Sequence, residues 1–310
     1  MNAATEEEDK NEMMCCASCG ISGVDDVKLK NCTACYLVRY CSITCQKTHR
    51  PKHKRECRKR AAELRDELLF KQPVINYRGD CPICCLPLPV EGTKCSTSVC
   101  CSKMICLGCN FANQMREKGG RLERKCVFCR HPIPCDDEEL KIIVQKRVEA
   151  NDPVAVFRMG LRCYDAGDYK AAFEYWTKAV DSGDTRAMIY AHFKLSIMYR
   201  DGNGVERSKK KQIYHLEEAS IAGDPIARNK LGCIEEEYGR MGRAVKHWII
   251  AAKLGEDNAL NALKSCYKLG DVSKEDFATA LRAHQAFVNE TRSPQRDIAE
   301  ASAQRYNWAD

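Results

Sequence analysis

The 310-residue sequence has no long apolar run. A helix that crosses a membrane needs roughly 18 or more consecutive apolar residues, and no such stretch occurs. The first ten residues, MNAATEEEDK, are acidic and polar, so we expect no signal peptide. We therefore expect no membrane span and favour the cytosol or the nucleus, where thiols stay reduced.

Cysteine is almost absent from the second half of the chain. Of the 22 cysteines, 19 lie between Cys15 and Cys135. A reducing compartment disfavours disulfides, and the C-x-x-C pairs in this region suit tetrahedral coordination of zinc by thiolates. The other three lie alone in helix-like sequence and are predicted to be small buried apolar side chains: Cys163, Cys233 and Cys266.

Residues 16–57, the first finger, hold seven cysteines and one histidine at metal-ligand spacing. So short a segment cannot bury an apolar core large enough to offset its chain entropy. Two zinc ions would supply the missing folding energy, because each binds small fingers with an apparent free energy of roughly 10–16 kcal/mol. The candidate ligands are Cys16, Cys19, Cys32, Cys35, Cys41, Cys45, His53 and Cys57.

The first finger resembles the MYND-type zinc finger, including YCS at Tyr40–Ser42, CQ at Cys45–Gln46 and HK at His53–Lys54. That family interleaves its ligands between two zinc ions. The resemblance implies one zinc on Cys16, Cys19, Cys41 and Cys45, and the other on Cys32, Cys35, His53 and Cys57. Arg50 stands where the family usually has tryptophan, so the family's partner groove is a weaker expectation than its metal sites. Cys15 is a spare cysteine.

A basic strip runs through the end of the first finger, over residues 47–60. Leu64, Leu68 and Leu69 follow at helical spacing, which predicts a connecting helix. Proteins that bind single-stranded nucleic acid interleave aromatic residues with basic ones, and residues 41–60 contain no aromatic residue. We therefore favour a solvated helix face and keep nucleic-acid binding through residues 47–60 as a weaker hypothesis.

Residues 79–135, the second finger, contain a further set of C-x-x-C pairs. Their separations resemble those of a RING finger, in which ligand pairs one and three hold one zinc and pairs two and four hold the other. The resemblance implies a first site of Cys81, Cys84, Cys106 and Cys109. The second site then contains Cys126 and Cys129, with two further ligands from the middle of the segment.

Those two further ligands are where the sequence departs from the RING pattern. RING fingers usually place a histidine two residues after the third ligand, and counting from Cys101 this position is Lys103. A protonated lysine cannot bind zinc, so we predict that Cys100 and Cys101 complete the second site, with Cys95 as the reserve candidate. The predicted non-ligands are Cys85 and Cys135.

RING-type ubiquitin ligases have no catalytic nucleophile and act by positioning a charged ubiquitin-conjugating enzyme. The family uses an apolar residue between the first two ligands, an arginine after the last ligand and a nearby proline. By resemblance these are Ile83, Arg130 and Pro132. The guanidinium could bridge ubiquitin and the conjugating enzyme through its fork of donors. The alternative is that Ile83 and Pro132 merely cover a zinc site and Arg130 is a surface charge.

The formal net charge of +7 is counted with neutral thiols. A zinc ion held by four thiolates carries a formal charge of about −2, and one held by three thiolates and a neutral histidine about −1. With four zinc ions in the two fingers, the net charge falls close to zero. Global charge therefore does not support a nucleic-acid partner.

Helical repeats follow the fingers. DDEELKIIVQKRVEANDP predicts a helix with an acidic first turn that ends before Pro153. Three copies of one pattern then recur, each ending in glycine followed by Asp184, Asp224 or Glu256, which marks a helix end and the next helix start. The aligned positions are Ala172, Trp176, Ala179 and Gly183; Gln212, Leu216, Ala219 and Gly223; and Ala244, Trp248, Ala251 and Gly255.

This pattern resembles the Sel-one-like subclass of tetratricopeptide-type repeats, with a diverged fourth unit from Ala259 to Asn289. Trp176 and Trp248 are predicted to fill gaps between paired helices. The resemblance implies a solenoid with a concave face for peptide binding. We find no catalytic constellation in this region, and the final stretch TRSPQRDIAEASAQRYNWAD lacks a sustained apolar stripe and is expected to be loose.

The predicted fold class is multi-domain: two small zinc-stabilised fingers of α+β type with little regular structure, followed by an all-α helical-repeat solenoid. Two functions fit this order. One is a RING-type ubiquitin ligase whose repeats and MYND-type finger recruit a protein substrate; the other is a non-enzymatic adaptor with structural zinc. The predicted segments are an acidic disordered stretch 1–14, the first finger 16–57, a helical linker 58–78, the second finger 79–135, the repeats 137–290 and a flexible tail 291–310.

Overall fold

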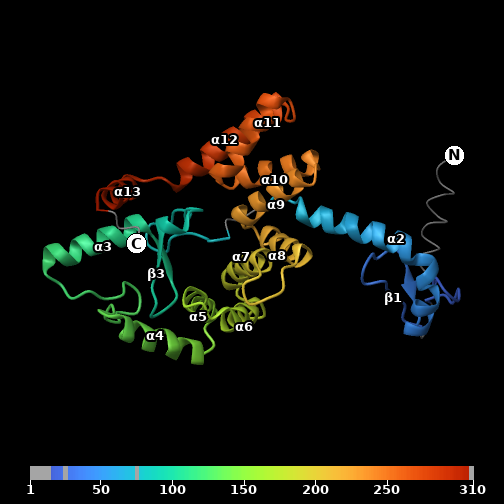
Figure 1. Ribbon diagram of the computed structural model, residues 1–310, viewed down its shortest axis with the longest axis horizontal. Helices are drawn as coiled ribbons and strands as arrows, with labels where there is room; N and C mark the ends of the chain where they lie inside the picture. Colours follow the sequence, from blue (N-terminus) through green and yellow to red (C-terminus); the bar gives the residue numbers. More distant parts are fainter. Residues whose placement is uncertain (1–14, 24–26, 74–76, 307–310) are drawn as a thin grey trace. The chain divides into compact units, whose positions relative to one another are not determined.

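The structure is a computed structural model that describes residues 15–23, 27–73 and 77–306 (Figure 1). It divides into two compact units, residues 1–71 and residues 72–310. The acidic stretch 1–14, predicted to be disordered, lies outside the described residues. Among the described residues, no helix combines the length and the apolar character needed to cross a membrane.

The first unit consists of a short hairpin and one long helix. Strand β1 (Lys30–Asn31) pairs antiparallel with β2 (Arg39–Tyr40). Helix α2 (Ile43–Leu69) begins at Ser42, whose hydroxyl accepts a hydrogen bond from the backbone N–H of Cys45. This one helix includes the last three ligands of the first finger and much of the segment predicted as a linker.

Cysteine side chains form most of the core of the first unit. Its cluster of buried residues consists of Cys16, Cys32, Cys35 and Tyr40. Such a core buries too little apolar surface to stabilise a fold without help. This agrees with the expectation from the sequence that metal ions take the place of a hydrophobic core.

The second finger opens the second unit. A single turn of 3-10 helix, η1 (Gly92–Lys94), leads into strand β3 (Cys95–Thr97), which pairs antiparallel with β4 (Met104–Cys106). Helix α3 (Leu107–Gly120) follows directly, and the sulfur of Cys106 accepts the backbone N–H of Cys109 at its start. The hairpin and the helix therefore bring the third ligand pair to the centre of the finger.

The rest of the second unit is helical. Consecutive helices pack against each other from α4 to α12, as expected for a repeat solenoid (Figure 1). The predicted acidic first turn is present, because α4 begins with three acidic residues after the N-cap Asp136. The helices are α4 (Asp137–Glu149), α5 (Pro153–Asp165), α6 (Tyr169–Val180), α7 (Thr185–Asp201), α8 (Lys209–Ile221), α9 (Pro225–Glu237), α10 (Met241–Lys253), α11 (Asp257–Leu269), α12 (Lys274–Thr291) and α13 (Pro294–Tyr306).

The repeat alignment is confirmed by burial. Trp176 and Trp248 are 0% and 1% exposed, and the aligned alanines of both copies are fully buried. Each indole packs on a glycine 16 positions earlier, since a Cβ on Gly160 or Gly232 would lie 2.4 Å from the indole nitrogen of its tryptophan. The sequence predicted the tryptophans as core residues but did not identify these glycines.

The predicted helix boundaries between repeats are also present. Gly183, Gly223 and Gly255 all have positive φ, as expected for residues that end a helix in the left-handed conformation. The aspartates that follow the first two of them cap the next helix, each accepting a backbone N–H with its side chain. The middle copy carries Leu216 where the outer copies have tryptophan, and it is equally buried.

The C-terminal stretch differs from the prediction of a loose tail. Residues 294–306 form α13, which packs on α3 of the second finger (Figure 1). At the other end of the helical region, Arg158 on α5 donates to the Thr97 carbonyl. Both ends of the helical region therefore contact the second finger, which explains why residues 72–310 form one compact unit.

Candidate metal centres

The same tight turn presents four of the C-x-x-C pairs, two in each finger. In each turn a backbone N–H bonds back to the carbonyl of the first cysteine, four residues earlier. The residue that donates this bond has positive φ in every case, although a side chain there costs roughly 1–2 kcal/mol relative to the right-handed conformation. These residues follow the second cysteine of their pairs: Gly20, Tyr36, Cys85 and Arg130.

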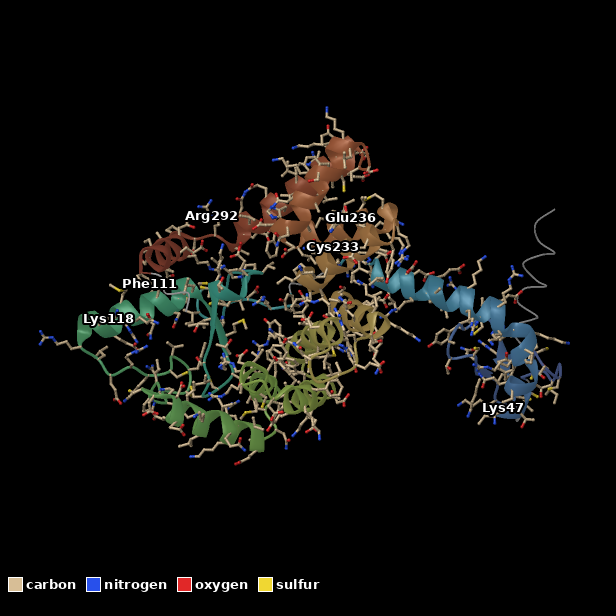
Figure 2. All side chains as sticks on the ribbon, viewed as in Figure 1. Lys47, Phe111, Lys118, Cys233, Glu236 and Arg292 are labelled. Atoms are coloured by element: carbon tan, nitrogen blue, oxygen red, sulfur yellow. The ribbon has the colours of Figure 1, made fainter. Side chains whose placement is uncertain are left out.

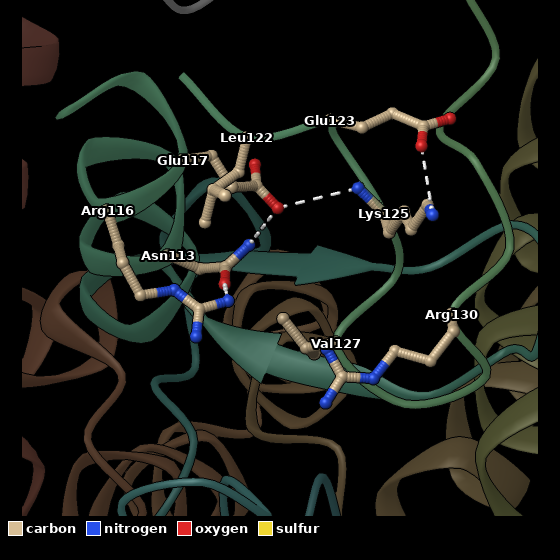
Figure 3. Close-up of a pocket in the computed structure, with 8 residues that line it drawn as sticks. All are labelled: Asn113, Arg116, Glu117, Leu122, Glu123, Lys125, Val127 and Arg130. Atoms are coloured by element: carbon tan, nitrogen blue, oxygen red, sulfur yellow. Dashed lines mark hydrogen bonds and ion pairs between the residues drawn. The ribbon is translucent and has the colours of Figure 1, made fainter. Parts of the chain in front are cut away.

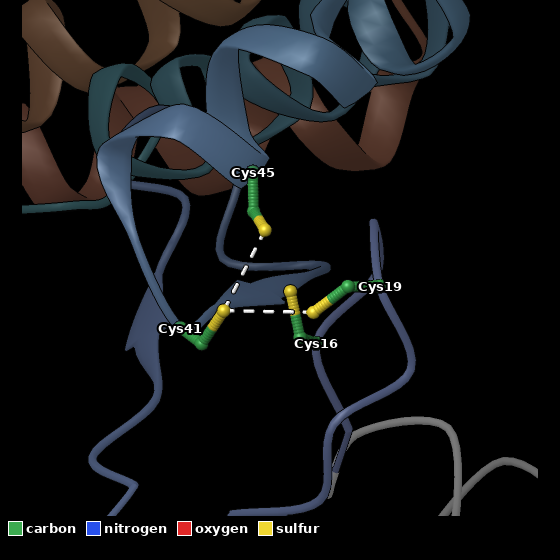
Figure 4. A group of neighbouring side chains, drawn as sticks. All are labelled: Cys16, Cys19, Cys41 and Cys45. Carbon is green, nitrogen blue, oxygen red and sulfur yellow. Dashed lines mark hydrogen bonds between the residues drawn. The ribbon is translucent and has the colours of Figure 1, made fainter.

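Cys16, Cys19, Cys41 and Cys45 form the first group (Figure 4). The Cys41 sulfur lies 3.6 Å from the sulfurs of both Cys19 and Cys45. Four sulfurs at about 2.3 Å from one tetrahedral zinc would lie about 3.8 Å apart, whereas disulfide-bonded sulfurs are separated by about 2.05 Å. The spacing therefore fits a shared zinc ion and excludes disulfides.

The second group of the first finger combines three cysteines with a histidine on α2. His53 and Cys57 are four residues apart, so they lie on the same face of the helix. The imidazole Nε2 of His53 lies 3.2 Å from the Cys35 sulfur, and the Cys57 sulfur lies 3.8 Å from that of Cys32. His53, Cys32 and Cys35 are all buried. Since α2 also carries Cys45, one helix joins the two groups.

The second finger has the interleaved arrangement that the sequence predicted. Cys81, Cys84, Cys106 and Cys109 form one group, and Cys100, Cys101, Cys126 and Cys129 form the other. The sulfurs of Cys84 and Cys106 are 3.8 Å apart. In the other group, the distance is 3.7 Å between the sulfurs of Cys101 and Cys126, and 3.3 Å between those of Cys100 and Cys129.

A turn without a first cysteine places Cys100 and Cys101. The backbone N–H of Ser102 bonds to the Ser98 carbonyl, and Ser102 has positive φ, as in the four cysteine turns. Ser98 therefore takes the place of the first cysteine, and the two adjacent cysteines project from this turn. Lys103 makes a cation–π contact, with its ammonium 4.9 Å from the centre of the Phe128 ring.

The spare cysteines lie outside the four groups. Cys95 is half-buried, and its sulfur contacts the Pro89 carbonyl; burial raises its pKa to about 11. Cys85, the left-handed residue of its turn, is exposed. Cys266 is buried in the core of the last repeats. None of the 22 cysteines, all of which the structure describes, forms a disulfide.

One cysteine in each group has a lowered pKa. Burial opposes ionisation of Cys16, but backbone N–H groups, first that of Cys19, lower the pKa of its thiol to about 6. Cys32 and Cys126 reach the same pKa for the same reasons, and that of Cys84 is about 7, with Arg296 contributing. Hydrogen bonds from neighbouring sulfurs, first Cys45, raise the pKa of Cys41 to about 12. A bound cation is therefore needed to hold all four thiols of a group ionised.

The donor sets fit zinc. The four ligand atoms of every group lie within 4.8 Å of one another. Three groups offer four thiolates, and one offers three thiolates and an imidazole, which are the usual ligands of structural tetrahedral zinc. The four groups thus fit four zinc ions, as the sequence predicted, and the assignment of individual ligands remains a prediction that metal analysis can test.

We expect purified protein to contain about four zinc ions per chain, and Cys101→Ser to contain about three. Serine cannot replace a thiolate ligand, so the second site of the second finger should empty. Elemental analysis after gel filtration measures the count. Cys95→Ser and Cys85→Gly are matched controls that should retain four; a loss of zinc in Cys95→Ser with retention in Cys101→Ser would reverse the assignment.

Comparison with known proteins agrees with two of the modules. The family model "MYND finger" matches residues 16–57, and the model "Sel1 repeat" matches residues 153–184 and 189–224. The chain carries a MYND finger and Sel1 repeats. Residues 79–135 lie outside the matched segments.

A crystal structure of a Sel1 repeat protein from Oxalobacter formigenes is similar to this chain. Its sequence is 21% identical, the alignment covers 63% of this chain and 86% of that one, and the TM-score is 0.42. Among curated proteins, none matches the chain. MYND fingers and Sel1 repeats generally mediate protein–protein contacts, so the chain is a zinc-finger protein of the protein-interaction class.

Sequence reasoning missed the residues that support the second finger from the helical region. Arg147 donates to the Cys100 carbonyl over 3.0 Å and also binds Asp152, which accepts the hydroxyl of Ser102. Arg296 reaches the other group through the Cys84 sulfur. These residues lie far from the cysteines in the sequence and form no spacing pattern with them.

Proposed function

We propose that the protein is an adaptor that binds protein partners through its MYND finger and Sel1 repeats, with zinc serving as structural support. The observation that supports this proposal is the grouping of every candidate ligand. All sixteen predicted ligands fall into complete sets of four, which leaves no open coordination position for a reactive water or substrate. Closed sites of this kind stabilise folds and do not catalyse reactions directly.

Capture of protein partners can test the adaptor proposal with variants that disrupt one unit at a time. Cys35→Ser should abolish the partners that bind the MYND finger, because it removes a ligand that is 1% exposed. Gly232→Ala should weaken the partners that bind the repeats. Crosslinking of the full-length zinc-loaded variants in cell extract, followed by mass spectrometry, should show two different subsets of lost partners. An unchanged partner set in both variants would contradict the adaptor.

A second candidate is RING-type ubiquitin ligase activity of the second finger. The favouring observation is that Ile83 is 46% exposed and that Arg130 and Pro132 are also exposed, on a finger with interleaved metal groups. An apolar side chain on the surface beside a zinc site suits docking of a conjugating enzyme better than it suits covering the metal. In this candidate the adaptor surfaces recruit the substrate.

Arg130 also lines a shallow pocket of about 220 Å³ between α3 and the last ligand pair (Figure 3). The pocket holds a small polar network, in which the Glu117 carboxylate accepts from the Asn113 amide and the backbone N–H of Lys125. Arg130 is exposed at the edge of this pocket. A partner could therefore reach its guanidinium, as the ligase candidate requires.

An autoubiquitination assay with a panel of conjugating enzymes distinguishes the two candidates. The ligase candidate predicts chain formation that falls at least about tenfold in Ile83→Ala and Arg130→Ala, since each removes a positioning contact. Both variants should keep four zinc ions, because neither residue is a predicted ligand. If no enzyme of the panel supports chain formation, the ligase candidate is rejected and the adaptor is the remaining proposed function.

Nucleic-acid binding remains a third and weaker proposal. Basic side chains such as Lys47 are exposed along α2 (Figure 2), while Arg60 is paired with Glu63 and Glu67. An affinity for oligonucleotides that falls steeply with salt would support it. For localisation we propose the cytosol or nucleus, because every candidate metal ligand except His53 is a cysteine that must stay reduced to bind zinc.

A further inference from the structure

Arg296 of α13 reaches the first metal group of the second finger. Its side chain is nearly inaccessible, with the residue 3% exposed. One guanidinium nitrogen, Nη1, donates to the Pro87 carbonyl over 2.7 Å. The other, Nη2, donates to the Leu86 carbonyl over 3.2 Å and lies 3.4 Å from the sulfur of Cys84. One side chain therefore joins a metal-ligand sulfur to the loop that follows the first ligand pair.

The backbone of α13 also approaches the same group closely. Gly108 lies between the ligands Cys106 and Cys109, and a Cβ placed on it would be 3.0 Å from the backbone N and Cα atoms of Arg296. A second contact, between Lys94 and Glu300 at 3.5 Å, anchors α13 one turn later. The position of Arg296 is thus set by backbone packing as well as by its own hydrogen bonds.

The chemistry of the group explains why a cation belongs there. Four thiolates around one zinc ion leave a formal charge of about −2 in a partly buried position. A hydrogen bond to a ligating atom orients the ligand and tunes the affinity of the site for metal. Guanidinium stays charged at all relevant pH values and offers several donors in a fixed plane, which lets it bind the Cys84 sulfur and the carbonyls of Leu86, Pro87 and Thr291 together.

Arg147 provides a comparison at the other metal group of the second finger. It contacts the Cys100 carbonyl but is also paired with Asp152, so its charge is already balanced. Its hydrogen bond supports the backbone of the site and does not reach a sulfur. The two ends of the helical region therefore support the two groups in different ways.

We propose that Arg296 is a positioning residue of the zinc site formed by Cys81, Cys84, Cys106 and Cys109, and that helix α13 completes this site. The guanidinium offsets the negative charge of the four thiolates and fixes the loop after the first ligand pair. Residues at the far end of the chain thereby control how tightly one of the four zinc ions is held. This role is independent of whether the second finger docks a conjugating enzyme.

Competition titration of the zinc-loaded full-length protein with a chromogenic chelator tests the proposal. In Arg296→Gln, one zinc of the four should bind about tenfold or more weakly, the range typical of lost contacts to metal ligands. Arg296→Lys, which keeps the charge, should restore part of that affinity. Glu300→Gln removes a partly exposed ion pair of α13 without touching a ligand. Such a pair contributes little to the docking of the helix, so this variant should leave all four affinities unchanged, as should Arg292→Gln.

Cobalt substitution gives a readout that separates a direct effect on the site from simple loosening of the helix. Sulfur-to-cobalt charge-transfer absorption should shift for one site in Arg296→Gln and stay unchanged in Glu300→Gln. Unchanged zinc affinities in Arg296→Gln would overturn the proposal. Equal weakening in Arg296→Gln and Glu300→Gln, with no rescue by Arg296→Lys, would also overturn it, because docking of α13 alone would then account for the effect.

Discussion

Cys35→Ser should lose zinc from the MYND finger and unfold residues 16–57. The sulfur of Cys35 is buried next to His53, and the core of this unit is composed mainly of ligand cysteines. A structural zinc contributes roughly 10–16 kcal/mol in apparent binding free energy, which equals or exceeds the stability of a typical small domain. The expected result is zinc loss with rapid proteolytic cleavage within the finger, measured by elemental analysis and mass spectrometry of limited digests.

The helical region should survive this substitution. Neither metal group of the MYND finger takes a ligand from residues 72–310. Cys15→Ser is the matched control, since Cys15 lies beside the first ligand but outside the groups, and it should retain zinc and protease resistance. A Cys35→Ser protein that keeps four zinc ions and resists proteolysis would show that the first unit folds without this site.

The equivalent substitution in the second finger should behave differently. Cys81 is fully buried in a finger that contacts both ends of the helical region. Cys81→Ser should therefore lower the thermal midpoint of the helical circular-dichroism signal, whereas Cys35→Ser should leave it unchanged. Because residues 72–310 form one compact unit, we expect the second finger and the repeats to unfold together.

Gly232→Ala should destabilise the repeats by about 1–3 kcal/mol, the usual effect of adding a methyl group to a tightly packed core. The new Cβ would lie 2.4 Å from the indole nitrogen of Trp248, whose ring is buried and cannot move aside freely. Gly160→Ala should have a similar effect because it meets Trp176 at the same distance. Urea unfolding followed by circular dichroism measures the change.

Gly242→Ala is the matched control for this prediction. Gly242 also lies in a repeat helix, but no atom lies within 4 Å of the place where its Cβ would be. The same substitution there should stabilise the protein by about 0.4–1 kcal/mol, because alanine restricts the unfolded chain more than glycine does. If Gly232→Ala also stabilised the protein, the close packing of tryptophan on glycine would be refuted.

Local patterns in the sequence predicted much of the fold and the four metal groups. The C-x-x-C pairs could be recognised in the sequence because each lies in a local element, a tight turn or a helix start, whose geometry depends on a few consecutive residues. The repeats could be recognised from the sequence because Trp176 and Trp248 recur at identical offsets from small residues. In both cases the structural information lies within a short stretch of chain.

Contacts between distant segments could not be predicted in this way. Arg296 and Cys84 are more than 200 positions apart, and hydrogen bonds to carbonyl groups leave no periodic mark on the sequence. The stretch around α13 is polar and carries no apolar stripe, which is why it was expected to be loose. The choice of Cys100 and Cys101 as ligands was a prediction from elimination, and its structural reason, the turn from Ser98 to Ser102, became visible only in three dimensions.

The attachment of both ends of the helical region to the second finger has a mechanical consequence. A helical-repeat solenoid is ordinarily flexible, and the pitch of its superhelix can change when a peptide binds. Here both ends of the helical region contact the second finger, one through α5 and the other through α13. If the repeats bind a peptide, as we propose, a change of pitch on binding would alter these contacts, and peptide binding and zinc binding would then be thermodynamically linked in both directions.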